Sequence, residues 1–274
     1  MTNQEIVTLH PRIFSPLWRR SPIKIIVSLM IFSYLIFSIK YFNISITDLI
    51  ESLNKMKPIL LSMITWNDFL SWNFSSIFTG ILQTLAMAFL GTIAASAISV
   101  PLGLLASRQV IKINIFQFII RRFLDFIRGV DILIWALIFV RAFGLGPLSG
   151  VLAIFVADTG TLSKLYSEAV DNSDNKQIEG IISSGSTKLS TIRFGLIPQV
   201  LPIFISQSLY FFESNSRSAV ILGIVGAGGI GLQLSERMKA QYWDQAFFII
   251  IIILIMVALI DRLSRILREK LIND

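Results

Sequence analysis

Apolar residues along this chain are gathered into six blocks, and polar or basic stretches separate them. The blocks cover residues 25–42, 77–105, 123–143, 148–165, 200–222 and 245–260. Most of them have about the 20 residues that an α-helix needs to cross a hydrocarbon core of about 30 Å. The second block is rich in Gly, Ala, Ser and Thr, which lets helices approach closely and places it inside a bundle. The pattern therefore predicts an all-α membrane protein with six transmembrane helices.

The same pattern divides the chain into four parts. Residues 1–24 form a polar, basic tail, and residues 25–75 hold the first span and a mixed segment on the outer face. Residues 76–265 carry the remaining spans and a polar loop at 171–198, and residues 266–274 form a second tail. The mixed segment contains four aromatic side chains, Trp66, Phe69, Trp72 and Phe74. Aromatic residues beside a span favour an interfacial segment, and a packed loop is nearly as well supported.

Basic residues are distributed unevenly between the two sides that six spans define. With both termini on one side, that side carries 17 of the 24 Lys and Arg residues in its loops and tails. Cytoplasmic loops are enriched in basic residues, so we expect both termini and the long loop at residues 166–196 in the cytoplasm. Because the charges lie between apolar blocks and not along one face, the net charge of +7 does not indicate nucleic-acid binding.

Composition excludes several kinds of chemistry. With 54% hydrophobic residues, the chain has too little polar surface for a water-soluble protein of this length. It has no cysteine, so disulfides, thiolate metal sites and cysteine nucleophiles are excluded. Its one histidine, His10, lies in the polar N-terminal tail, where a solvated side chain is the better interpretation. We therefore expect no catalytic residues, no cofactor and no metal site.

One glycine-rich stretch imitates a nucleotide-binding motif. Residues 226–231, Gly-Ala-Gly-Gly-Ile-Gly, satisfy the pattern G-x-G-x-x-G. That pattern indicates dinucleotide binding only between a strand and a helix, whereas here it follows an apolar span. A flexible loop on the outer face is the main interpretation, and a nest of backbone amides that touches an anion is the minor one. The chain also lacks a G-x-x-x-x-G-K-[ST] loop, so any ATP hydrolysis needs a separate chain.

The long polar loop contains the pattern of one short amphipathic helix. Three isoleucines at positions i, i+3 and i+4 share one helical face: Ile178, Ile181 and Ile182. Asp174 or Asn175 can cap the start of this helix, and Gly185 can end it. The apolar stripe needs a cover, which is either the chain's own bundle or a groove on a partner protein.

In the same loop Glu179-Gly180-Ile181 leads to Gly185, and Gly195-Leu196-Ile197-Pro198 follows after nine intervening residues. This spacing resembles the cytoplasmic signature of ABC importer permeases. In that signature Glu-Ala-Ala is followed by three residues, Gly, nine residues, Ile, one residue and Leu-Pro. The Glu, Gly and Pro fall at the family's spacing. The two alanines and the first isoleucine are replaced, and an isoleucine stands for the leucine.

Five further segments extend the resemblance: residues 144–147 (GLGP), 162–170 (LSKLYSEAV), 197–202 (IPQVLP), 212–219 (FESNSRSA) and 225–231 (VGAGGIG). They resemble the phosphonate ABC transporter permease, and the resemblance runs in unbroken order from about residue 76 to about residue 265. The resemblance implies a type I ABC importer permease fold, similar to that of the methionine permease. It also implies that the chain moves phosphonate, or a related phosphorus oxyanion such as phosphite, across the cytoplasmic membrane.

The resemblance implies partners and site residues as well. Two permease copies would form the channel in the lipid of the inner membrane. A dimer of cytoplasmic ATPase subunits would drive it, and an extracytoplasmic phosphonate-type binding protein would deliver the substrate. The residues that would couple to the ATPase are Glu179, Gly180, Ile181, Ile182, Gly185 and Pro198. A short rigid helix of this kind can convert closure of the ATPase into rocking of the spans.

Four charged residues inside the expected spans need a partner or a wet cavity, because charges in hydrocarbon are costly. Glu213 and Arg217 lie one helical turn apart and can pair with each other. Alternatively, Arg217 faces the pore and helps a phosphonate to pass, because a guanidinium matches its oxygens well. For Asp131 and Asp158, pore lining and hydrogen bonding between helices are equally well supported.

Three other functions stay open on the sequence alone. A permease for another small solute, such as methionine, would carry the same coupling loop. An intramembrane enzyme would need converging nucleophiles or metal ligands, and without His or Cys in the spans only scattered carboxylates are left. A membrane anchor or assembly protein would not need the coupling signature. Co-purification with an ATPase separates the first of these functions from the other two.

Overall fold

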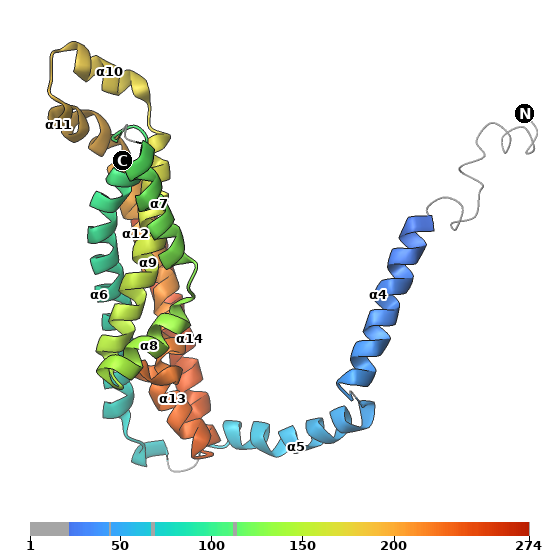
Figure 1. Ribbon diagram of the computed structural model, residues 1–274. Coiled ribbons are helices and arrows are strands. Elements are labelled where there is room, and N and C mark those ends of the chain that lie inside the picture. Colours follow the sequence, from blue (N-terminus) through green and yellow to red (C-terminus); the bar gives the residue numbers. More distant parts are fainter. Residues whose placement is uncertain (1–21, 44, 67–68, 112–113, 274) are drawn as a thin grey trace, which may run out of the picture. The chain divides into compact units, whose positions relative to one another are not determined.

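The structure is a computed structural model that describes residues 22–43, 45–66, 69–111 and 114–273. His10 and most of the N-terminal tail lie outside these residues. Within the described ranges every regular element is a helix, which confirms the predicted all-α class (Figure 1).

The chain divides into two compact units, residues 1–61 and residues 62–274. The first unit contains α4 (Pro22–Tyr41), which is apolar and long enough to cross a membrane. It also contains most of α5 (Ile46–Ile64), whose apolar residues gather on one helical face. The sequence pattern predicted α4 as the first span, and it did not predict that the mixed segment begins with a helix.

The second unit is a helical bundle. Its elements in chain order are a 3-10 turn η1 (Phe69–Ser71), α6 (Phe74–Ala106), α7 (Asn114–Arg128), α8 (Ile132–Phe143), α9 (Pro147–Asp171), α10 (Asn175–Ser183), α11 (Lys188–Thr191), a π turn η2 (Ile192–Leu196), α12 (Ile197–Leu222), a π turn η3 (Gly223–Ala227), α13 (Gly229–Lys239) and α14 (Trp243–Asn273). Helices α6, α9, α12 and α14 are long and apolar enough to span a membrane, and α8 is a shorter apolar helix. Figure 1 shows α10 and α11 at one end of this bundle and α13 at the other.

The expected third span is not one helix. The amphipathic α7 and the apolar α8 are separated at residues 129–131, which interrupts the predicted helix over residues 123–143. Asp131 accounts for the interruption, because its side chain accepts a 2.8 Å hydrogen bond from the Leu133 N–H and caps α8. With its 12 residues, α8 is about 18 Å long and therefore shorter than the hydrocarbon core.

Helices α6 and α9 pack against each other along much of their length. Glycines in α6 make this approach possible. A Cβ on Gly91 would lie 2.7 Å from side-chain atoms of Ile154, and a Cβ on Gly103 would lie 2.7 Å from Cβ of Tyr166. The small residues of the second apolar block therefore place α6 inside the bundle, as the sequence predicted.

The glycine-rich residues 226–231 are buried, so the expected flexible outer-face loop is a packed turn into α13. Glycines at positions 226, 228 and 229 have φ values of +110°, +80° and +71°, which other residues rarely adopt. The amides of Gly229 and Ile230 donate hydrogen bonds of 3.1 Å and 2.9 Å to the side chains of Gln83 and Thr84 in α6. The minor interpretation, in which a nest of backbone amides touches an anion, requires free amides. These two amides are already engaged and are not available to an anion.

The aromatic segment before α6 packs on α14. The rings of Trp66, Phe69, Trp72 and Phe74 all have their centroids 5.5–5.9 Å from that of Phe248. These spacings are typical of favourable ring pairs, and all four pairs are edge-to-face. The contacts favour the packed segment among the two predicted alternatives, and an interfacial position stays a prediction.

Replacing Gly91 with valine tests the close approach of α6 and α9. Because the added side chain would collide with Ile154, we expect the variant to lose about 1–3 kcal/mol of unfolding free energy, as overpacked cores do. Ala97→Val, on an exposed face of the same helix, is the matched control. Unfolding in detergent micelles, followed by circular dichroism, measures both variants. Equal stability of the two would show that the helices do not meet at Gly91.

Candidate functional site

The helix predicted in the long polar loop is present as α10. Asp174 caps its start, because the side chain accepts a 2.9 Å hydrogen bond from the Lys176 N–H. Asn175, the other candidate cap, is the first helical residue. Beyond the last turn, Gly185 has a φ of +80°, in the left-handed region that favours glycine. Both ends of α10 therefore lie where the sequence placed them.

The apolar stripe of α10 is turned toward the rest of the chain. Ile178 and Ile181 are half-buried, and a Cβ on Gly195 would lie 3.1 Å from Cδ1 of Ile181. Ile182 stays 55% exposed and lines a groove of about 1050 Å³. Packing against its own bundle, one of the two predicted alternatives, therefore accounts for two of the three isoleucines.

The opposite face of α10 is polar and open. Lys176 and Gly180 are exposed, and no heavy atom lies within 4 Å of a Cβ built on Gly180. Glu179 is also exposed and lines the groove together with Arg108 and Lys188. A partner protein that approaches this end of the bundle would meet a polar helical face with an unobstructed backbone at its centre.

The first turn of α12 holds the start of α10 in place. Gln199 accepts a 3.0 Å hydrogen bond from the Asp174 N–H through Oε1 and donates one of 2.7 Å from Nε2 to the Gly195 carbonyl. Pro198 lies exposed in the same turn, where the π turn η2 runs directly into α12. The predicted coupling residues are thus brought together at one end of the bundle (Figure 1).

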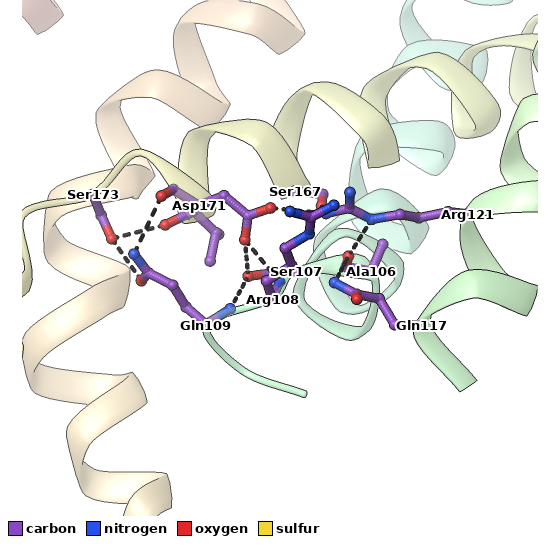
Figure 2. Close-up of polar contacts among 10 residues, drawn as sticks. Ala106, Ser107, Arg108, Gln109, Gln117, Arg121, Ser167, Asp171 and Ser173 are labelled. Carbon is purple, nitrogen blue, oxygen red and sulfur yellow. Dashed lines mark hydrogen bonds and ion pairs between the residues drawn. The ribbon is translucent and has the colours of Figure 1, made fainter. Parts of the chain in front are cut away.

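A carboxylate that the sequence analysis missed lies at the end of α9. Asp171 forms a 2.8 Å ion pair with Arg121 of α7. It also accepts hydrogen bonds of 2.7 Å from the Ser107 hydroxyl and 2.8 Å from the Arg108 N–H, just after α6 ends (Figure 2). No motif marks this residue. The only signal in the sequence is an acidic residue at the end of a span, opposite a basic connection.

Asp158 forms a buried hydrogen-bond chain across three helices. Asn215 of α12 donates from Nδ2 to the Asp158 carboxylate in α9 and, at 2.8 Å, to the Thr92 hydroxyl in α6. The three residues are at most 6% exposed. Asp158 therefore makes the predicted hydrogen bonds between helices. It also lines a cavity of about 250 Å³ together with Asp131.

Glu213 and Arg217 belong to a larger ion network between α12 and α14. The predicted pair is present but long, with 3.6 Å between Arg217 Nη2 and Glu213 Oε1. Arg217 lies closer to Asp261, at 2.8 Å, and Glu213 pairs with Arg268. Both of these closer partners belong to α14. The two residues therefore hold α12 to α14 in addition to contacting each other.

The four predicted intramembrane charges form two clusters and not one site. Asp131 and Asp158 line the 250 Å³ cavity, together with Asn215 on one face of α12. Glu213 and Arg217 extend toward α14. Because successive residues of an α-helix are about 100° apart, Glu213 and Asn215 lie about 160° apart around the α12 axis. The two clusters therefore occupy opposite faces of this helix.

Residues 99–273 match the family of binding-protein-dependent transport system inner membrane components. The chain belongs to this family. The match covers α10, both clusters of intramembrane charges and every helix from α7 to α14. The chain is therefore a multi-pass inner membrane protein and a transport subunit, as predicted, and not an enzyme.

Several curated relatives are transport permeases. The putative phosphite transport system permease protein HtxC of Stutzerimonas stutzeri is 37% identical over 72% of this chain and 70% of its own. The phosphate-import permease protein PhnE of Mycolicibacterium smegmatis is 37% identical over 72% of this chain and 37% of its own, longer sequence. The putative cryptic phosphonate transport system permease protein PhnE2 of Escherichia coli is 47% identical over 44% of this chain and 100% of its own.

The fold is also known from solved structures. An inward-facing MetNI methionine ABC transporter matches 72% of this chain and 97% of its own chain with a TM-score of 0.63 at 19% identity. The structure of an amino acid ABC transporter matches 76% of this chain and 99% of its own chain, with a TM-score of 0.63 at 17% identity. At these identities the likeness concerns the fold alone, and it confirms the predicted type I, methionine-permease-like architecture.

Replacing Asn215 with alanine tests the buried chain at Asp158. The carboxyl, which is only 6% exposed, would lose its donor, so we expect a loss of about 1–3 kcal/mol of unfolding free energy. The double variant Asp158→Leu, Asn215→Leu removes both partners and should recover most of that loss. Unfolding in detergent micelles measures both. A double variant that is no more stable than Asn215→Ala would mean that the two side chains do not interact.

Proposed function

We propose that this chain is the membrane-spanning subunit of an ATP-driven importer of phosphonate or a related phosphorus oxyanion such as phosphite. The observation that carries the proposal is the transport function for which the relatives are named. Those described above are named as phosphite, phosphate and phosphonate permeases, at 37–47% identity. Methionine, the alternative solute, is supported only by the fold of a structure at 19% identity.

The proposed assembly contains a second copy of this chain, a dimer of cytoplasmic ATPase subunits and an extracytoplasmic binding protein. The family description supports the binding protein and the inner membrane. The excess of basic residues supports a cytoplasmic position for both termini and for α10. Figure 1 is consistent with this topology, because the C-terminal end of α14 lies at the same end of the bundle as α10.

In this assembly α10 is the helix that couples the bundle to the ATPase. Three of the proposed coupling residues are exposed on it: Glu179, Gly180 and Ile182. Ile181 has a different role, because it packs on Gly195 and holds α10 against its own bundle. Gly185 ends the helix, and Pro198 starts α12 beside it. A rigid α10 can therefore pass a displacement to α12 and the adjoining spans.

The cavity beside α12 is the better candidate for the translocation path than the α12–α14 ion network. Arg217 has two acidic neighbours, so it offers little net positive charge to an anion. Hydroxyl side chains line the cavity: Thr161, Ser214 and Ser218. Two of them, Thr161 and Ser218, donate long 3.4 Å hydrogen bonds to carbonyls of their own helices and would have to turn to reach a phosphorus oxyanion. Asp131 and Asp158 lie there too. We infer that their carboxylates are occupied by the Leu133 N–H and the Asn215 amide, not by substrate.

Uptake measurements test the proposed substrate. The chain is reconstituted into liposomes with its ATPase and its binding protein. We expect these vesicles to accumulate labelled phosphite or 2-aminoethylphosphonate only when ATP is present on the cytoplasmic side, and not to accumulate methionine. Methionine accumulation without uptake of either phosphorus compound would replace this proposal with the amino-acid alternative.

Replacing Gly185 with valine tests the coupling role of α10. A β-branched residue at a φ of +80° is strained, so α10 should end differently and ATPase co-purification should fall about tenfold, which corresponds to about 1.4 kcal/mol of binding free energy. Gly144→Val is the matched control, because Gly144 has a φ of +89°, an equally open surrounding and no place in the loop. Unchanged co-purification for Gly185→Val would contradict the coupling assignment.

A further inference from the structure

Asp171 occupies a position that is unfavourable by itself. It is the last residue of α9, and a helix C-terminus carries a partial negative charge that repels a carboxylate. Contacts from other elements compensate for this. Asp171 Oδ2 accepts from Arg121 Nη2 at 2.8 Å, and Oδ1 accepts from the Ser107 hydroxyl and the Arg108 N–H. Both carboxylate oxygens are therefore engaged, and each contacts an element other than α9 (Figure 2).

Arg121 joins Asp171 to the end of α6. The last carbonyls of a helix have no partner within it and need donors from elsewhere. The Ala106 carbonyl, at the end of α6, accepts two hydrogen bonds. One comes from Arg121 Nε at 2.8 Å and the other from Gln117 Nε2 at 3.0 Å. One guanidinium thus contacts the ends of two spans at once. Ser107, which follows α6 and donates to Asp171, is fully buried.

The segment that leads from α9 into α10 is held from the same place. Gln109 donates from Nε2 to the Asp171 carbonyl and to Asn175 Oδ1, both at 3.3 Å. Its Oε1 accepts a 3.0 Å hydrogen bond from the Ser173 hydroxyl. The three residues 172–174 between the two helices are therefore fastened to the connection that follows α6.

We propose that Asp171, Arg121 and Gln109 form a clasp through which a movement of α10 reaches α6 and α7 as well as α9. They are positioning residues, because they act through α10 and contact no substrate. The inference rests on the proposed function, in which α10 receives the ATPase. It adds the connection that makes the loop rigid with respect to three helices of the bundle.

The length of the linker explains why such a clasp is needed. Three extended residues span about 10 Å, so a free linker would let α10 shift by several ångströms without moving α9. With the clasp closed, a shift of α10 pulls on residues 107–109 and on Arg121 at the same time. The ATPase stroke would then move α6, α7 and α9 together.

The bundle offers a matched control between the same two helices. Asp125 of α7 and Lys164 of α9 form an ion pair of 3.1 Å, one or two turns away from the clasp. This pair joins α7 to α9 in the same way, but it contacts neither the end of α6 nor the linker to α10. Asp125→Asn therefore removes an equivalent charge without opening the clasp.

The first experiment measures coupling in the reconstituted importer. In Asp171→Asn we expect ATPase activity to be retained. The ratio of phosphite transported to ATP hydrolysed should fall at least about fivefold, which corresponds to the low end of typical coupling free energies. Gln109→Leu, which keeps the ion pair and removes only the hold on the linker, should lower the same ratio. Asp125→Asn should leave it unchanged. A wild-type ratio in both Asp171→Asn and Gln109→Leu would overturn the proposal.

The second experiment needs no substrate. Amide hydrogen exchange of the chain in detergent should become about tenfold faster at residues 107–111 and 172–175 in Asp171→Asn, and not in Asp125→Asn. Unaltered exchange at both segments would also overturn the clasp. If exchange responds as expected while the wild-type importer takes up no phosphorus oxyanion, the clasp stands and the proposed substrate fails.

Discussion

The close approach of α6 and α9 is the constraint on which the rest of the bundle depends. Helices in lipid gain little from burying apolar surface, so their association relies on packing and on hydrogen bonds. Gly91 and Gly103 let the two backbones meet, and at Gly103 the contact reaches Tyr166 near the end of α9. This register brings Ser107, directly after α6, beside Asp171, where α9 ends. The loop helix α10 is therefore fixed relative to two spans and not to one.

Helix α12 shows how a single span separates polar groups with different tasks. One of its faces meets α14 through a network in which Glu213 and Arg217 each have a partner of opposite charge. The other face carries Asn215, which connects α9 and α6 through uncharged donors and one acid. Because a buried charge in hydrocarbon needs compensation, the charges on the face toward α14 are paired, whereas the face with Asn215 lines the 250 Å³ cavity.

The sequence predicted the parts of the fold that the bilayer or local geometry dictates. Block lengths gave the spans, and the capping residue Asp174 with the stop at Gly185 gave α10, because these signals depend on neighbours along the chain. The interruption at Asp131 was not predictable, since an acid in an apolar block is either a buried charge or a helix cap. Only the backbone around it decides between the two.

The remaining parts of the candidate site depend on partners far apart in sequence. The pair Glu213–Arg217 was expected from its spacing, yet nearer partners come from α14, 44 and 55 residues away. Asp171 meets Arg121 across 50 residues and Ser107 across 64. No periodicity or motif encodes such distances. They become visible only when packing of α6 on α9 has fixed which helix ends are neighbours.

The composition of α10 becomes understandable once these contacts are considered. A glycine in a helix interior costs about 0.5–1 kcal/mol relative to alanine, and Gly180 occupies a position where the importer signature has alanine. The cap at Asp174 contributes about 1 kcal/mol in the opposite direction. The side chains of Gln109 and Gln199 then hold the helix start from two sides. The rigidity that the proposed coupling role of α10 needs would come from these contacts at its start, so its exposed face can accept glycine.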